Sequence, residues 1–395
     1  MNTGYKKTIT ACFIGYIVQA IVNNFVPLLF LTFSTTYRIP LSKITLLITV
    51  NFVIQLLIDA SSVAFVDKIG YRASMIIAHL MAFSGLVSLT ILPVLLPDAF
   101  AGLLISVAIY AVGGGLLEVL VSPIVEACPT DNKEKAMSLL HSFYCWGQVG
   151  VVLIATVYFK LFDISNWRIL AVMLSLIPLI NAFVFIKVPI GSLVEDGETK
   201  FSLREIFSQK IFWFFIIMMV CAGASELAVS QWASTFAEKG LNVSKSIGDL
   251  AGPMSFAILM GCSRAFYGKF GDKINLDKFM IISTILCIVS YLMIALIPVP
   301  ALSLLGCAIT GLSVGIMWPG TFSKAAASLR RGGTTVFALL ALAGDLGCSG
   351  GPTLVGMISS SMNDNLCYGI LCAAVFPLLM LVCLLYTVKR GSGVN

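Results

Sequence analysis

Twelve separate stretches of the chain are predominantly apolar, and each is roughly 20 residues long, enough to cross a hydrocarbon layer about 30 Å thick. They occupy residues 8–31, 43–66, 73–96, 101–126, 136–159, 167–187, 211–236, 246–268, 279–297, 300–322, 333–360 and 365–388. A backbone surrounded by lipid must satisfy its own hydrogen bonds, so we expect a helix in each stretch. The alternating segments that mark a membrane β-barrel are not seen in the sequence.

The composition supports the same class of protein. Of the 395 residues, 58% are hydrophobic and 11% are charged, whereas a soluble protein carries about 25% charged residues. This is too little charge to cover a globule in water, so lipid must solvate most of the surface. The eleven cysteines form no CxxC pair. We interpret them as small apolar core residues, and we expect neither a metal site nor a cofactor.

The basic residues are distributed unevenly between the two sets of loops. Only six of the 25 Lys and Arg residues fall in the loops opposite the N-terminus: Arg38, Lys43, Lys160, Arg168, Lys239 and Lys245. The positive-inside rule then predicts that both termini of this multi-pass protein lie on the cytoplasmic side of the inner (plasma) membrane. The net charge of +6 follows from this bias, so we expect a lipid bilayer and no nucleic acid as a partner.

The longest polar stretch, Gly191–Lys210, follows the sixth apolar span. It divides the chain into an N-terminal six-helix bundle (1–190), a cytoplasmic linker (191–210) with a short surface helix near Leu203–Ser208, and a C-terminal six-helix bundle (211–395). A similar loop joins the second and third spans of each half, with Asp67-Lys68-Ile69-Gly70-Tyr71-Arg72 in one and Gly268-Lys269-Phe270-Gly271-Asp272-Lys273 in the other. Two parallel six-helix repeats are typical of carriers whose halves rock against each other.

These loops resemble the G-x-x-x-D-[RK]-x-G-[RK]-[RK] motif of the major facilitator superfamily, although Val63 replaces the first glycine in the first copy. The resemblance implies an all-α membrane protein with twelve transmembrane helices in two six-helix pseudo-symmetric bundles. It also implies that the loop residues, with Arg264 nearby, form a cytoplasmic gate. The expected gating residues are Asp67, Lys68, Gly70, Arg72, Arg264, Gly268, Asp272 and Lys273. The alternative is that these charged loops only anchor helix ends.

The fourth span carries a second, narrower resemblance. Its sequence from Gly113 to Pro123, with Glu118 and Ser122 inside it, is similar to the G-x-x-x-E-x-x-x-N-P signature of the fucose–proton symporter branch. Ser122 stands in place of the asparagine. The resemblance implies that Glu118 takes part in proton coupling and in sugar recognition. In the first span an asparagine, within Asn23-Asn24, stands where that branch has an acidic residue.

Four acidic residues lie well inside the spans: Asp59, Glu118, Glu226 and Asp345. Placing a charge in the hydrocarbon core costs about 2.5–3.5 kcal/mol or more, so such residues are functional candidates. We expect all four to take part in proton coupling. The alternatives are that Asp59, two helical turns before Asp67, extends the cytoplasmic latch, and that the other three only hold helices together.

A sugar site combines hydrogen-bonding side chains with an aromatic ring. The residues of this kind that we expect to bind the substrate are Gln19, Asn23, Asn24, Gln55, Glu118, His141, Tyr144, Gln148, Glu226, Gln231, Trp232 and Trp318. In the fifth span, His141, Tyr144 and Gln148 recur at a spacing that puts them on one helix face. Histidine there, with its titration near neutral pH, can also assist proton movement.

These residues favour a secondary active transporter that takes up a sugar or similar small polar solute with protons, acting as a monomer. The second interpretation is proton-driven efflux of amphipathic compounds or lipid, but the fifth span lacks the proline of the G-x-x-x-G-P-x-x-G-G exporter motif. The third is a membrane sensor that transports nothing. No nucleotide-binding, metalloprotease or serine-hydrolase motif occurs in the sequence, so we do not expect an enzyme. The choice between symport, antiport and uniport stays open.

Overall fold

The computed structural model describes residues 3–129, 133–190, 203–297, 299–329 and 333–391, and every regular element in these ranges is helical. The chain divides into two compact units, Met1–Glu195 and Asp196–Asn395. Residues 191–202 of the expected linker lie outside the described ranges, and the short helix expected near Leu203–Ser208 is present as α8, Leu203–Ser208. We describe each unit by itself.

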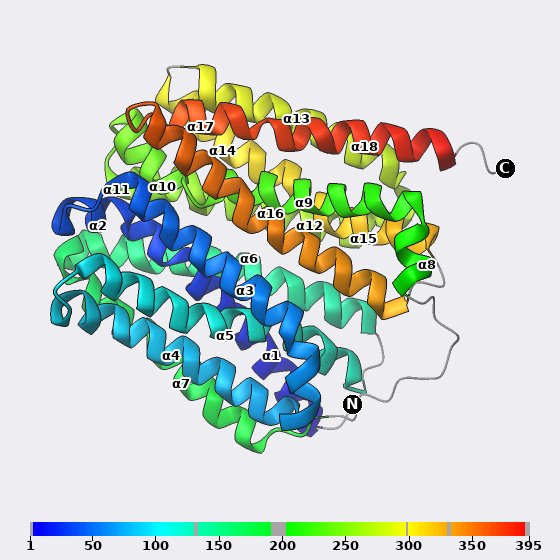
Figure 1. Cartoon of the computed structure of the whole chain (residues 1–395), viewed down its shortest axis with the longest axis horizontal. Coiled ribbons are helices and arrows are strands. Elements are labelled where there is room, and N and C mark those ends of the chain that lie inside the picture. Colours follow the sequence, from blue (N-terminus) through cyan, green and yellow to red (C-terminus); the bar gives the residue numbers. More distant parts are fainter. Residues whose placement is uncertain (1–2, 130–132, 191–202, 298, 330–332, 392–395) are drawn as a thin grey trace. The chain divides into compact units, whose positions relative to one another are not determined.

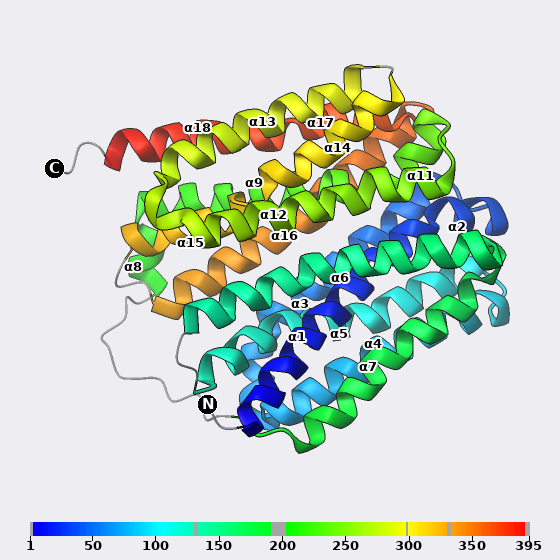
Figure 2. The ribbon, with the colours of Figure 1, turned by 180° about the vertical axis from the view of Figure 1, so that it is seen from behind.

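The described part of the first unit contains six long helical segments, whose arrangement is drawn in Figures 1 and 2. Its elements are α1 (Thr3–Asn24), η1 (Val26–Leu29), α2 (Phe30–Tyr37), α3 (Leu41–Ile69), α4 (Tyr71–Leu95), α5 (Ala99–Ala127), α6 (Lys133–Phe162), η2 (Ile164–Asn166) and α7 (Trp167–Lys187). Helix α5 packs along both α3 and α4, and α1 contacts α5 and α6. The side chains that α1, α3, α5 and α6 direct toward one another therefore form the interior of this unit.

The second unit again contains six long segments in its described part, which Figure 2 draws from behind. After α8 come α9 (Lys210–Ser230), α10 (Ala233–Thr235), η3 (Phe236–Gly240), α11 (Lys245–Asp249), η4 (Leu250–Met254), α12 (Ser255–Phe270), η5 (Gly271–Lys273), α13 (Leu276–Leu296), α14 (Pro300–Val314), α15 (Met317–Ser328), α16 (Gly333–Ser361), α17 (Leu366–Ala373) and α18 (Val375–Gly391). Helix α9 packs closely on α16 and also contacts α18.

Helices occupy all twelve apolar stretches, which confirms the expected fold class. Among the described residues, ten helices are long and apolar enough to cross a membrane by composition alone. The eighth and eleventh expected spans fall outside these ten. The eighth carries Lys245, Asp249 and Arg264, and the eleventh, α16, is rich in glycine and serine around Asp345. Both depart from the composition of a lipid-facing helix because they contribute charged and small residues to packing.

Several of the long segments are interrupted, among them the first, the seventh and the tenth. The first span breaks between α1 and η1, where Pro27 has no N–H to continue the helix. The seventh breaks at Gln231 and Trp232, and the tenth between Val314 and Met317. Discontinuous helices are common at the binding sites of secondary transporters, because the interrupted backbone needs polar partners. Five of the expected substrate residues, Asn23, Asn24, Gln231, Trp232 and Trp318, lie at or next to these breaks.

Glycine allows α9 and α16 to approach closely in the second unit (Figure 1). A Cβ atom added at Gly347 would lie 2.0 Å from the carbonyl oxygen of Val220, and one at Gly223 would lie 2.2 Å from that of Gly344. Neither backbone oxygen can move without moving its helix. Small residues thus bring two transmembrane helices together, as is usual where lipid gives no hydrophobic driving force.

We expect Gly347→Ala to destabilise the protein by about 1–3 kcal/mol, because the added methyl group must push α16 away from α9. The measurement is thermal unfolding of the purified full chain in detergent. Gly350→Ala, three residues along the same helix, is the matched control, because a Cβ atom there meets nothing within 4 Å. Equal midpoints for the two variants would contradict this account of the packing.

Candidate functional site

An asparagine on α1 connects three helices of the first unit. Asn23 Oδ1 accepts a hydrogen bond from Asn51 Nδ2 at 3.1 Å and another from Gln55 Nε2 at 2.8 Å. Asn51 and Gln55 share one face of α3 because they are four residues apart. Tyr144 of α6 adds its hydroxyl, 3.5 Å from Asn23 Nδ2 and equally far from Asn24 Nδ2. We call Asn23, Asn51, Gln55 and Tyr144 the amide cluster.

The amide cluster leaves two acceptors without a hydrogen bond. Both amide groups on α3 donate to the same oxygen of Asn23, and their own oxygens, Asn51 Oδ1 and Gln55 Oε1, are buried with no hydrogen-bond partner among the described residues. The two side chains are 5% and 2% exposed. A buried acceptor without a partner costs about 1–3 kcal/mol. Such oxygens are therefore suited to accept hydrogen bonds from a bound molecule.

Three glycines precede Glu118 on α5 and let this helix approach its neighbours closely. A Cβ atom added at Gly113 would lie 2.5 Å from Ala78 O on α4. One added at Gly114 would lie 3.2 Å from the amide carbon of Gln55, and one added at Gly115 would lie 3.0 Å from the Gln55 backbone on α3. The glycines therefore let α5 lie directly against α3 and α4. One turn later, Glu118 Oε2 accepts a hydrogen bond of 2.8 Å from Gln19 Nε2. Gln19 thus links Glu118 on α5 to α1, the helix that also carries Asn23.

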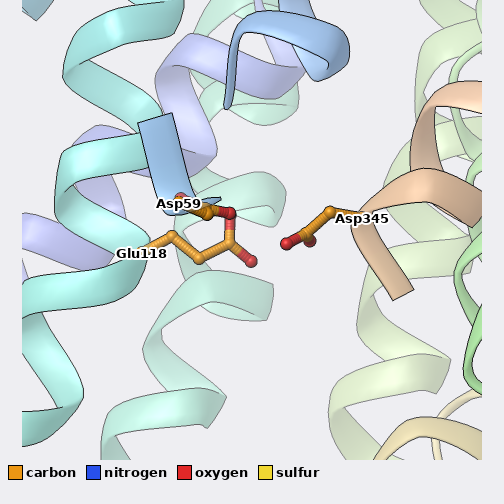
Figure 3. A group of neighbouring side chains, drawn as sticks. All are labelled: Asp59, Glu118 and Asp345. Carbon is orange, nitrogen blue, oxygen red and sulfur yellow. The ribbon is translucent and has the colours of Figure 1, made fainter. Parts of the chain in front are cut away.

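Asp59 lies on the same face of α3 as Gln55, one turn further along, and points toward Glu118 (Figure 3). A carboxylate oxygen of Asp59 and one of Glu118 lie within 4.8 Å of each other. The sequence gives each of these acids a role separately, but it does not predict that they meet. Their approach depends on the close packing of α3 on α5 that the glycines permit.

The three residues of the expected polar face of α6 do not share one environment in the structure. Tyr144 belongs to the amide cluster and Gln148 is buried, whereas His141 is exposed and its ring lies 5.5 Å from that of Tyr16. Tyr16 itself was not expected from the sequence. Its hydroxyl lies 2.9 Å from Ser122 Oγ, so the serine that replaces the asparagine of the family signature still makes a hydrogen bond between α1 and α5.

In the second unit, Glu226 and Arg264 form an ion pair between α9 and α12. Arg264 Nη2 donates to Glu226 Oε2 at 3.1 Å, with 19% and 11% of the two side chains exposed. The sequence groups Arg264 with the gating residues and also makes it the basic residue at a depth to pair with one of the four acids, and the structure brings its guanidinium to Glu226. An arginine is well suited to a largely buried pair, because its planar group stays charged and matches a carboxylate.

The two tryptophans of the second unit pack against α16. Trp232 Nε1 donates to the carbonyl oxygen of Pro352 at 2.9 Å, and a Cβ atom at Gly344 would lie 2.2 Å from the Trp318 ring. The Trp318 ring therefore lies against the backbone next to Asp345, the α16 residue labelled in Figure 3. Asp345 and Gln231 are both buried. Trp318 thus packs on α16 beside Asp345, and Trp232 packs on the same helix about two turns further along.

The expected gating loops differ between the units. Gly70 joins α3 to α4 with a φ of 83°, a backbone conformation that favours glycine. Arg72 Nη1 donates to Phe185 O and Ile186 O, at 2.7 and 2.8 Å, at the C-terminal end of α7. Arg72 therefore donates hydrogen bonds to carbonyl groups that have no partner within their own helix.

In the second unit Lys273 is exposed. Lys324 of α15 pairs with Asp277 of α13, a contact that the sequence did not predict. The side chains of Asp67, Lys68 and Asp272, and the surroundings of Gly268, lie outside the described part.

The described residues form twelve helical segments in two units, with acidic and amide side chains in the interior and interrupted helices beside them. The chain belongs to the Major Facilitator Superfamily, whose family model matches residues 10–352, and is therefore a membrane transporter and not an enzyme. No curated protein matches the chain.

Several solved structures share the fold. The fucose:proton symporter of E. coli is 14% identical, with a TM-score of 0.67 over 97% of this chain and 99% of that one. The xylose transporter of E. coli, in a partially occluded inward-open conformation, is 14% identical, with a TM-score of 0.77 over 98% of both chains. A bacterial homologue of the human lysosomal transporter Spinster is 14% identical, with a TM-score of 0.73 over 98% of both chains. Identities this low show the fold alone.

Proposed function

We propose that this transporter takes up a sugar or a similar small polar solute by alternating access, and that a proton moves inward with it. The proposal places the protein in the plasma membrane with both termini in the cytoplasm, as the distribution of Lys and Arg predicts. The first unit supplies the solute-binding groups and the second supplies the proton-binding group.

The observation that carries the proposal is the pair of buried oxygens, Asn51 Oδ1 and Gln55 Oε1, that have no hydrogen-bond partner among the described residues. A solute that satisfies them must bring hydrogen-bond donors on neighbouring atoms. The Asn24 amide and the Tyr144 hydroxyl nearby can both donate and accept. The hydroxyl groups of a sugar also donate and accept, and so match this mixture. A quaternary ammonium compound or a lipid chain has no such donor and would leave the buried oxygens unsatisfied, which disfavours efflux of such compounds.

Glu226 is the group to which we assign the proton. While it is ionised, the carboxylate holds Arg264 at 3.1 Å. Protonation removes the negative charge and weakens that contact, so the two charge states of Glu226 favour different positions of α9 and α12. A proton that changes a helix–helix contact can drive a conformational change. Two of the structurally similar proteins are named as proton symporters, of fucose and of D-xylose, in agreement with this proposal.

The test is the pH of a lightly buffered suspension of de-energised cells that overproduce the protein. Sugars are added one at a time, and cells carrying an empty vector are the control. We expect one class of sugar to make the medium alkaline, because protons enter the cells with the solute. The proposal is contradicted if no sugar gives a response and if lipophilic cations, added to cells given an inward proton gradient, cause proton movement. The protein would then be an efflux transporter.

A further inference from the structure

The short helix α8 of the second unit does not continue into the seventh span. Gln209, between α8 and α9, has an extended backbone with a φ of −77° and a ψ of 112°, and α8 lies at an angle to the start of α9 (Figure 1). Ile206 on α8 and Phe212 on α9 are both buried and hold α8 in this position. The apolar span itself begins at Lys210. Helix α8 therefore lies at the level where the span enters the bilayer.

Two aromatic rings are exposed at this level. Phe207 is 42% and Trp213 is 49% exposed, and their ring centroids lie 5.9 Å apart. Trp213 Nε1 donates to the carbonyl oxygen of Phe207 at 3.0 Å, which ties the indole ring to α8. Aromatic side chains are enriched at the interface between membrane and water. The two rings therefore lie at the height of the lipid headgroups.

Each of these rings has a basic residue beside it. Arg204 precedes Phe207 by three residues, and Lys210 precedes Trp213 by three, a spacing that makes neighbours on a helix surface. Arg204 and Lys210 are exposed, and neither forms an ion pair with another described residue. Glu205 is the acidic residue of α8. The three charged side chains together leave this surface with one net positive charge.

The N-terminus of α9 adds to the positive potential at Lys210. The helix dipole makes this end of a helix positive, and its N-cap, Gln209, makes no side-chain cap hydrogen bond among the described residues. Helix α13 also has an exposed lysine, Lys278, in its first turn, but there Asn275 Oδ1 accepts from Lys278 N at 3.0 Å. The two lysines thus differ in the capping of the helix end beside them and in the exposed aromatic ring that accompanies Lys210.

We propose that Arg204, Lys210 and the N-terminus of α9 bind the phosphate of an anionic phospholipid, with Phe207 and Trp213 against its acyl chains. Guanidinium, ammonium and backbone N–H groups are all donors, and phosphate oxygens are acceptors. A zwitterionic lipid also carries an ammonium group, which the two basic side chains repel. This site goes beyond the proposed function, because it requires no particular solute or coupling ion.

The test uses lipids whose acyl chains carry bromine, which quenches tryptophan fluorescence on contact. The full chain is reconstituted in mixed phosphatidylglycerol and phosphatidylcholine vesicles in which one lipid or the other is brominated. The Trp213 signal is the difference between each protein and the same protein with Trp213→Phe. We expect phosphatidylglycerol to quench Trp213 roughly fivefold more effectively at equal mole fraction, as one net charge near the surface implies. Arg204→Gln or Lys210→Gln should bring this ratio to about one, and Glu205→Gln should raise it about fivefold.

Lys278→Gln is the matched control and should keep the wild-type ratio. Lys210→Arg, which retains the charge, should keep most of it, and added sodium chloride should lower it in the wild type. Quenching by brominated phosphatidylcholine reports whether α8 still lies in the bilayer, so a misfolded variant is recognised by a loss of quenching by both lipids. Equal quenching of wild-type Trp213 by the two lipids would overturn the site. So would an equal fall of the ratio in Lys278→Gln and Lys210→Gln, or quenching by neither lipid, which would mean that α8 contacts water or another protein.

Discussion

Glu226→Gln is expected to abolish accumulation of the solute against its gradient while it leaves exchange of solute across the membrane intact. Glutamine has the shape of a protonated glutamate but can neither take up nor release a proton. Its amide oxygen can still accept the hydrogen bond that Arg264 Nη2 donates to the wild-type carboxylate, so the contact between α9 and α12 has a partner in the variant. Uptake of labelled solute into energised vesicles should therefore reach the external concentration and stop.

Exchange is measured by counterflow, in which vesicles loaded with unlabelled solute take up labelled solute without an ion gradient. Counterflow in Glu226→Gln shows that the variant is folded and binds solute. Glu226→Asp, which keeps a carboxyl group, should restore part of the accumulation, and Glu205→Gln on the exposed face of α8 should behave as the wild type. Undiminished accumulation in Glu226→Gln would show that the coupling proton does not bind to Glu226.

The fold was predictable because lipid restricts what a chain can do. A span must be apolar, about 20 residues long and helical, and each of these requirements is visible in the sequence. The break after α1 also has a local cause in Pro27. The π-helical turn at Leu250–Met254 likewise contains Pro253, whereas the one at Phe236–Gly240 contains no proline. They lie where Lys245 bridges Glu238 and Asp249, and such pairings depend on how α10 and α11 pack.

The residue types of the site were also predictable, because charged and amide groups inside a membrane span are energetically costly and therefore indicate a functional role. Which of these side chains bind to one another was not predictable. Glu226 and Arg264 are 38 positions apart, and Gln19 and Glu118 are 99 apart, and no periodicity connects such distant positions. The meeting of Asp59 with Glu118 depends on three glycines whose role becomes clear once α5 lies against α3. Arg264 shows the same limit, because its depth in the eighth span marked it as the basic residue able to pair with a buried acid, but nothing in the sequence identified Glu226 as its partner.

Asn23→Leu is expected to weaken solute binding about 10- to 100-fold with little change in the folded structure. Asn23 Oδ1 accepts from Asn51 Nδ2 and from Gln55 Nε2, and it therefore fixes the direction in which both amide groups present their own oxygens. Leucine fills a similar volume but leaves both donors without this acceptor, at about 1–3 kcal/mol for each buried group. The two amides then turn to find other partners, and the solute loses their oxygens. The measurement is the concentration dependence of counterflow.

Two other variants separate this effect from a general loss of stability. Asn23→Asp keeps an acceptor for both donors and should retain most of the affinity, although it loses the amide that lies near the Tyr144 hydroxyl. Asn181 is equally buried, and its Nδ2 lies 2.8 Å from His79 Nε2 and donates to Ala11 O at 3.0 Å. Asn181→Leu should therefore lower the unfolding temperature but leave the half-saturating solute concentration unchanged. Equal losses of affinity in Asn23→Leu and Asn181→Leu would mean that Asn23 acts through packing alone, and the amide cluster would then no longer be the solute site.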